Sequence, residues 1–298
     1  MQVKADVLAL AAVLLWSTLA ALVLLLKDVP PLLLTGSGLL IGSALSLPIS
    51  RFRLISAWTI PTKTLALGIF GLFGYHMALF FALRNAPAAE ANLINYLWPV
   101  AIVLLTPIFL RGFELRLNHV IAAALGFGGS AFAILSAPEA QSDLQSEDWG
   151  SRVAGFVAAF AAAMIWATYS VLTKRRPAFD TAAIGLFGLI SGVLALVLHL
   201  LLERPYSWQQ GDLLWLLLLG LGPLGLAFYL WDSAIKLGNP IRIGLMSFLT
   251  PLVSTVGVLL VQGRPPTASI GIAALLIVGA GAIGILPQTT NVRNGKSR

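Results

Sequence analysis

The sequence predicts an all-α integral membrane protein with ten transmembrane helices, arranged as two inverted repeats of five helices each. The composition is 58% hydrophobic and only 10% charged over 298 residues, and the mean hydropathy is +0.90. Apolar runs of roughly 20 residues recur along the whole chain, and the two halves share short motifs in the same order. Such a composition leaves too little polar surface for an ordinary water-soluble domain.

The length of the apolar runs matches the thickness of a membrane. A bilayer core about 30 Å thick needs roughly 20 helical residues, because each residue adds about 1.5 Å and no backbone polar group can stay unpaired in lipid. The ten predicted spans are Asp6–Leu26, Pro31–Ser50, Thr64–Leu83, Ala91–Leu110, Asn118–Ala137, Val153–Thr173, Thr181–Leu202, Asp212–Ile235, Ile241–Val261 and Thr267–Leu286. The first run is too long for a signal-peptide core, so we expect it to be retained as a span.

The basic residues favour one side of this arrangement. Of the 19 Lys and Arg residues, five fall in connectors opposite the N-terminus, which leaves 14 (19 minus 5) on the N-terminal side. The five are Lys27, Arg84, Arg152, Arg204 and Arg264. Cytoplasmic loops of membrane proteins are enriched in Lys and Arg, so both termini are predicted to be cytoplasmic.

The second half of the chain repeats motifs of the first half at an offset of about 150 residues. The clearest matches are Trp16-Ser17-Thr18 with Trp166-Ala167-Thr168, and Tyr96-Leu97-Trp98-Pro99 with Phe248-Leu249-Thr250-Pro251. Because each half has an odd number of spans, the two copies cross the membrane in opposite directions, as in many transporters. The predicted organisation is a first repeat at 1–138, a periplasmic connector at 139–150, a second repeat at 151–288 and a cytoplasmic tail at 289–298.

Several classes of function find no support in the residues. The chain has no cysteine, which excludes disulfides and thiolate chemistry. Its net charge of +7 comes from short connectors rather than from a phosphate-binding patch, so no nucleic acid partner is expected. The sequence contains neither an HExxH motif nor a P-loop, and the three histidines are widely separated. We therefore predict no cofactor, no metal site and no enzymatic activity.

Aromatic and polar side chains at mid-depth are the candidate functional residues. They are Trp16, Tyr75, His76, Tyr96, Trp98 and Trp166. Tyr and Trp normally gather at the membrane interfaces, so their polar atoms at mid-depth need an internal partner or a water-filled cavity. Plain helix packing is the alternative for each ring, but convergence from four spans favours a ligand-binding cavity.

Polar groups could orient a ligand there. His76 is the ionisable side chain predicted nearest the bilayer centre, which makes it a functional candidate; the alternative is a neutral imidazole bonded to a neighbouring helix. Asn92 and Asn95 recur on one predicted face of span four together with Pro99, and that face could hold a zwitterion. Interhelical hydrogen bonding is the alternative for both amides.

The positions of the carboxylates and prolines give two further predictions, on proton coupling and on helix kinks. No Asp or Glu is predicted as deep as His76, which argues against tight proton coupling. Glu90 and Asp232 lie near span ends, where either snorkelling or pairing with Arg84 and Lys236 respectively is expected. Kinks or hinges are predicted at Pro99, Pro223 and Pro251.

Three short strings carry a resemblance to a known family: Gly74-Tyr75-His76, Asn95-Tyr96-Leu97-Trp98-Pro99, and the pair Trp16 and Trp166. On these, and on its ten spans, the chain resembles the drug/metabolite transporter superfamily with two tandem EamA domains. The resemblance implies a basket-like fold in the bacterial inner membrane and a cavity lined by spans one, three, four, six, eight and nine. It also implies export of amino acids and related metabolites. Span eight differs in having Ala227-Phe228 where span three has Tyr75-His76.

The combined prediction is a monomeric secondary carrier that exports amino acids, aromatic and other hydrophobic ones favoured, by facilitative alternating access. Its partners would be this small-molecule substrate and the lipid bilayer. A proton-coupled exporter of drugs or other metabolites would have the same architecture and stays an alternative. An alternative of another class is a membrane enzyme or scaffold without transport.

Overall fold

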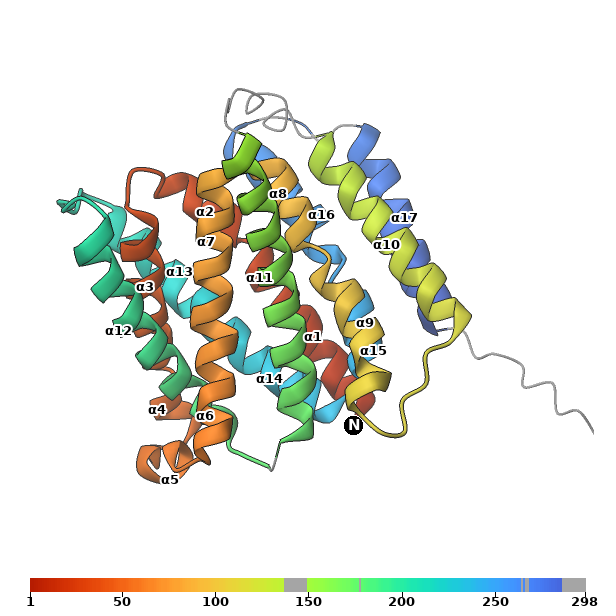
Figure 1. Ribbon diagram of the computed structural model, residues 1–298, viewed down its shortest axis with the longest axis horizontal. Coiled ribbons are helices and arrows are strands. Elements are labelled where there is room, and N and C mark those ends of the chain that lie inside the picture. Colours follow the sequence, from red (N-terminus) through yellow and green to blue (C-terminus); the bar gives the residue numbers. More distant parts are fainter. Residues whose placement is uncertain (137–148, 177, 264, 266–267, 286–298) are drawn as a thin grey trace, which may run out of the picture.

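The computed structural model describes residues 1–136, 149–176, 178–263, 265 and 268–285 (Figure 1). Within these residues the secondary structure is helical throughout, with no strand. In chain order the helices are α1 (Gln2–Ser17), α2 (Leu19–Leu25), α3 (Pro31–Ser43), α4 (Ser46–Ile49), α5 (Leu54–Trp58), α6 (Thr62–Ile69), η1 (Phe70–Gly74), α7 (Tyr75–Asn85), α8 (Ala88–Asn95), α9 (Trp98–Phe109), α10 (Leu117–Leu135), α11 (Trp149–Arg175), η3 (Thr181–Ala183), α12 (Ile184–Leu202), α13 (Asp212–Leu221), η4 (Gly222–Leu226), α14 (Ala227–Leu237), α15 (Pro240–Met246), α16 (Leu249–Val261) and α17 (Ala268–Ile285).

These helices join into ten membrane passages, which confirms the predicted fold class. In the described part of the chain, nine passages are long and apolar enough to cross a bilayer, and the shorter apolar α17 is the tenth. The passages coincide with the predicted spans to within a few residues. Two passages begin four residues earlier than predicted: α1 at Gln2 rather than Asp6, and α11 at Trp149 rather than Val153, so that α11 extends into the predicted connector. Residues 139–148 of the predicted connector and the predicted tail, 289–298, lie outside the described residues.

The contacts between the halves follow the symmetry of an inverted repeat. Three pairs of corresponding passages contact each other: α3 with α12, α9 with α15, and α10 with α17. The first passage packs on the eighth, α1 on α14, while the sixth packs on the third, α11 on α7. Exchanging the two halves turns each of these last two contacts into the other, so one two-fold operation relates the whole set.

Irregular backbone occurs at matching positions in the two halves. The third passage contains the π-helical turn η1 at Phe70–Gly74, and the eighth contains η4 at Gly222–Leu226. The fourth passage is interrupted between Asn95 and Trp98, and the ninth between Met246 and Leu249. Each predicted proline lies in or just after an interruption: Pro223 in η4, Pro99 at the start of α9 and Pro251 at the start of α16. Their action as hinges stays a prediction.

One expected ion pair is wrong and one is confirmed. Glu90 pairs with Arg152 at 3.6 Å rather than with Arg84, because α8 and the start of α11 pack together. The Arg84 guanidinium instead lies 5.4 Å from the centre of the Phe80 ring. Asp232 pairs with Lys236 at 2.6 Å, as expected.

Small residues allow the second and eighth passages to approach closely, and Gly42 shows how closely. A Cβ placed on Gly42 would lie 2.6 Å from the Cα of Gly225 and 2.6 Å from the carbonyl oxygen of Leu224. Both are backbone atoms, so they cannot rotate away as a side chain would.

We therefore expect Gly42→Ala to destabilise the protein by about 1–3 kcal/mol, the usual range for overpacking a tight contact. Thermal unfolding in detergent measures the effect. Gly128→Ala is the matched control, because a Cβ there would meet no atom within 4 Å in the described structure. Equal stability of the two variants would show that the contact at Gly42 is loose.

Candidate functional site

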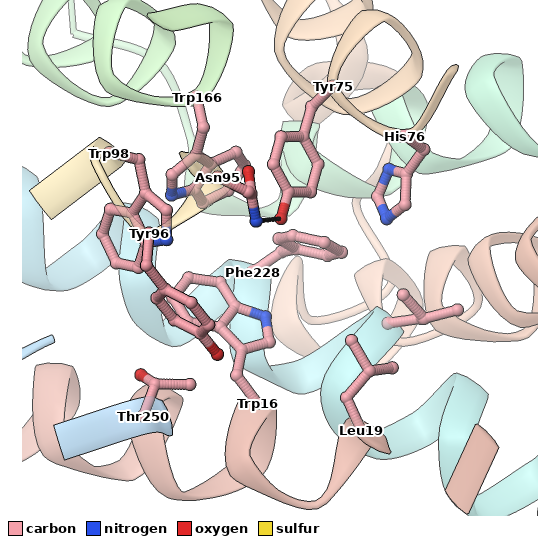
Figure 2. Close-up of a pocket in the computed structure, with 11 residues that line it drawn as sticks. Trp16, Leu19, Tyr75, His76, Asn95, Tyr96, Trp98, Trp166, Phe228 and Thr250 are labelled. Carbon is pink, nitrogen blue, oxygen red and sulfur yellow. Dashed lines mark hydrogen bonds between the residues drawn. The ribbon is translucent and has the colours of Figure 1, made fainter. Parts of the chain in front are cut away.

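Six of the mid-depth residues meet around one cavity at the level of the helix interruptions (Figure 2). They come from passages one, three, four and six, and passages eight and nine complete the wall. The lining residues are Trp16, Leu19, Tyr75, His76, Asn95, Tyr96, Trp98, Trp166, Leu224, Phe228 and Thr250. This set of passages is the one that the family resemblance implied.

The tryptophans form a packed cluster whose rings also border the cavity. Trp16 lies at its centre: its ring centroid is 5.5 Å from that of Trp166 and 6.3 Å from that of Trp98, both edge to face. Its indole N–H donates to the carbonyl oxygen of Pro223 at 3.1 Å, an atom in the η4 turn. Edge-to-face packing holds each ring in one orientation. The cavity therefore has a rigid aromatic wall.

Trp231 belongs to this cluster but was not predicted. Its centroid lies 5.1 Å from that of Trp16 and 5.5 Å from that of Trp98. The side chain is only 1% exposed, and its indole N–H donates to Ser170 Oγ at 3.0 Å. Trp231 lies near the end of the predicted span Asp212–Ile235, so its position along the chain does not indicate the central layer. Its spacing of three residues from Phe228 puts both rings on one face of α14, which is the signal that could have found it.

Thr250 is the second functional candidate that the sequence reading missed. It lines the cavity from the first turn of α16. Within the repeat it corresponds to Trp98, at an offset of 152 residues. The alignment of the two halves is therefore the sequence signal that points to Thr250.

The polar predictions are partly changed by the structure. Asn95 Nδ2 donates to the Tyr75 hydroxyl at 3.3 Å, which links passages four and three. His76 Nδ1 lies 2.6 Å from the carbonyl oxygen of Leu72, which can only accept, so Nδ1 carries a proton. This partner lies on the same passage as His76 and not on a neighbouring helix. Among the described lining residues none is Asp, Glu, Lys or Arg.

Asn92 and Pro99 lie away from this inner space. Asn92 lines a wider cavity of about 430 Å³, together with Pro251. Pro99 was expected to share a helix face with Asn92 and Asn95, and this expectation is wrong. Pro99 is buried at the start of α9 and lines neither cavity, because the interruption at Tyr96 and Leu97 breaks the helical periodicity. Pro223 also does not face the cavity, and contributes through the carbonyl oxygen that Trp16 binds.

The wider cavity opens at the face opposite the N-terminus. It shares Trp16, Leu19, Tyr75, Asn95 and Tyr96 with the inner space, so the two are continuous. Its other walls come from the ends of passages one and three, the start of passage four and the second half of passage nine, all at that face. Its volume falls within the range of small-molecule sites, roughly 300–1,000 Å³.

The N-terminal face is closed by the corresponding residues of the other half. Leu79 and Leu83 line the open cavity, whereas the residues 152 positions later, Trp231 and Ile235, are buried. Ser254 likewise lines the open cavity, whereas its counterpart Ile102 is buried. The same structural segments thus form an open path in one half and a closed one in the other.

Polar contacts reinforce this closed face. The Lys174 ammonium at the end of α11 donates to three carbonyl oxygens at the end of α14, those of Ile235, Lys236 and Gly238, at 2.9, 3.0 and 2.6 Å. The Arg242 guanidinium lies 2.8 Å from Asp6. Terminal helix carbonyls have no partner within their helix, so an ammonium group satisfies them well. These contacts tie passage six to passage eight and passage nine to passage one.

Comparisons with known proteins agree with this architecture. Residues 3–135 and 153–286 each match the model of the EamA-like transporter family. The aromatic amino acid exporter YddG of Ancylobacter novellus is 38% identical over 286 residues, covering 95% of this chain and 97% of that protein. The aromatic amino acid exporter YddG of Escherichia coli is 25% identical over 286 residues, covering 93% and 94%. A crystal structure at 35% identity superposes with a TM-score of 0.88, covering 96% of this chain and 97% of that one. The chain therefore belongs to the EamA-like transporter family.

Proposed function

We propose that this protein exports amino acids across the bacterial inner membrane, with aromatic and other hydrophobic amino acids favoured. The observation that carries the proposal is the uncharged, ring-lined cavity between two inverted halves, open at one face and closed at the other. The names of the two exporters described above agree with it. Because one chain forms the whole cavity, we take the functional unit to be a monomer.

The binding chemistry follows from the wall. Trp16, Trp98, Trp166, Tyr75 and Tyr96 offer flat apolar surfaces on which a substrate ring can stack, and they attract cationic groups through their ring faces. His76, Asn92 and Asn95 supply hydrogen-bonding groups for the α-amino and α-carboxyl groups. A fixed aromatic wall with neutral polar groups gives moderate affinity, which suits a carrier that must release its substrate on the far side.

Transport proceeds by alternating access. In the described state the substrate site communicates with the face opposite the N-terminus, and the distribution of Lys and Arg makes that face periplasmic. Exchanging the roles of the two halves closes the outer path and opens the inner one. The gradient of the substrate itself drives the net movement, since the cavity wall described here has no carboxylate to bind a coupling proton.

The orientation can be tested by labelling, because the natural chain has no cysteine. Ser207 lies in the connector between α12 and α13, and Ser56 lies in α5, on the N-terminal face. We expect an impermeant maleimide to label Ser207→Cys in intact spheroplasts, and Ser56→Cys only after lysis. The reverse pattern would invert the proposed direction of transport.

Stacking can be tested with two tryptophans of the same helix. Trp166 lines the cavity from the middle of α11, whereas Trp149 at its start is 71% exposed. Removal of one stacking ring costs about 0.5–1.5 kcal/mol beyond the buried area, so Trp166→Ala should raise the apparent KM for phenylalanine uptake into liposomes several-fold. Trp149→Ala is the control. A cationic dye that is transported while phenylalanine and threonine are not would contradict the proposed substrate class.

The closed face can be tested at Lys174. Hydrogen bonds to a charged group are worth about 1.5–3 kcal/mol each. Lys174→Met should therefore shift the equilibrium constant between the outward-open and inward-open states toward the inward-open state by roughly tenfold or more. The readout is the labelling rate of a cysteine at Ile102, which is buried in the closed face, measured in inside-out vesicles. The neighbouring exposed Arg175→Met is the charge-matched control. Equal rates in the two variants would show that Lys174 does not hold the closed state.

A further inference from the structure

Two buried polar atoms in the cavity wall have no hydrogen-bond partner among the described residues: Asn95 Oδ1 and Thr250 Oγ1. The two side chains come from different halves, at the end of α8 and the start of α16, and both line the inner space (Figure 2). Asn95 is only 4% exposed and Thr250 only 5%. An unsatisfied buried polar atom costs about 1–3 kcal/mol, so two of them on side chains that line one cavity favour a ligand that bonds to both.

Other polar atoms of the two residues are already engaged. The amide nitrogen of Asn95 donates to the Tyr75 hydroxyl at 3.3 Å, which directs the acceptor-only Oδ1 elsewhere. The Thr250 backbone N–H donates to the carbonyl oxygen of Ser247 at 3.0 Å, and its own carbonyl oxygen accepts from Ser17 Oγ at 3.3 Å. Each residue therefore keeps one side-chain oxygen without a partner among the described residues, an acceptor on Asn95 and a hydroxyl on Thr250.

The surroundings specify the charge of the ligand. A solute with a net charge would find no opposite charge in this desolvated wall, because none of the described lining residues is Asp, Glu, Lys or Arg, so it should bind more weakly than a zwitterion does. A zwitterion needs only neutral dipoles, because its own charges compensate each other. The interruptions beside Asn95 and Thr250 also bring helix ends to this depth, with partial charges of both signs.

We propose that Asn95 and Thr250 together select solutes that carry one ammonium and one carboxylate group. Asn95 Oδ1 accepts a hydrogen bond from the ammonium, and the Thr250 hydroxyl donates one to the carboxylate. The proposal rests on the function proposed above and names the two residues that recognise the charged end of the substrate. Because Thr250 replaces the Trp98 of the other half, only one half carries this donor, and a bound zwitterion takes one orientation across the pseudo-two-fold axis.

The test uses three related ligands with the purified full-length protein. Phenylalanine has both charged groups, 2-phenylethylamine lacks the carboxylate, and 3-phenylpropionate lacks the ammonium. Each dissociation constant is obtained by titration, with intrinsic tryptophan fluorescence as the signal. Thr250→Val should weaken phenylalanine and phenylpropionate about tenfold and leave phenylethylamine unchanged. Asn95→Leu should weaken phenylalanine and phenylethylamine by a similar factor and leave phenylpropionate unchanged.

Two further variants separate recognition from folding. Asn95→Asp keeps the acceptor and adds a negative charge, so it should bind phenylethylamine more tightly than the wild type does, a gain that a misfolded site cannot produce. Thr106→Val, in α9, removes a hydroxyl that already donates to the Ile102 carbonyl oxygen at 2.6 Å, and Thr106 is not among the residues that line either cavity. This control should keep the wild-type order of affinities for the three ligands.

The outcomes are distinguishable. Equal losses for all three ligands in both variants, or no loss in either, would overturn the assignment of Asn95 and Thr250 while leaving amino acid export intact. A wild-type protein that binds neither phenylalanine nor threonine would instead overturn the proposed function itself. The crossed pattern of losses, together with the gain in Asn95→Asp, supports the proposal.

Discussion

Water is absent from the hydrocarbon core of a bilayer, so every backbone N–H and C=O that leaves a helix there must find a partner inside the protein. This constraint explains where the chain is irregular. The π-helical turns η1 and η4 and the two interruptions beside Asn95 and Phe248 lie near the middle of their passages, and residues in or directly beside them line the cavity. The freed carbonyl oxygen of Pro223 is bound by the Trp16 indole. The irregular backbone, the aromatic side chains and the cavity therefore occur together, because the side chains around the cavity can satisfy the freed backbone groups.

The two halves share a backbone but not a set of side chains. Their interruptions agree to within a residue or two, whereas the residues around them differ in size: Leu79 on the open side corresponds to Trp231 on the closed side. A bulky buried indole fills the path toward the N-terminal face, and smaller residues leave the opposite path wide. The symmetry thus provides two comparable arrangements, and the side chains decide which one the described state adopts. Lys174 adds a polar contact to the same closed face.

The site could be predicted in outline because depth in the membrane can be counted along a helix. Tyr75, Tyr96 and Trp98 were placed in the central layer by such counting, and the structure brings them together. Counting depth does not reveal which way a side chain faces across an interrupted helix. It also leaves out Trp231, which reaches the cluster from a position nearer the inner end, while the helical spacing that places Pro99 on the face of Asn92 does not continue across the interruption. The partner of Glu90 could not be predicted from sequence proximity, since Arg152 belongs to the sixth passage and Arg84 to the neighbouring third one.

The sequence by itself determined the number of passages, their limits to within a few residues and the duplication of the two halves, because bilayer thickness and hydrophobicity act on each segment independently. Only the tertiary structure decided that the cavity opens at one face and closes at the other. It also decided that Trp231 packs in the aromatic cluster and that Thr250 lines the cavity. Asn95 and Thr250 each keep one buried side-chain oxygen without a partner among the described residues. These properties depend on how helices from both halves pack against each other, and neighbours along the chain carry no information about that packing.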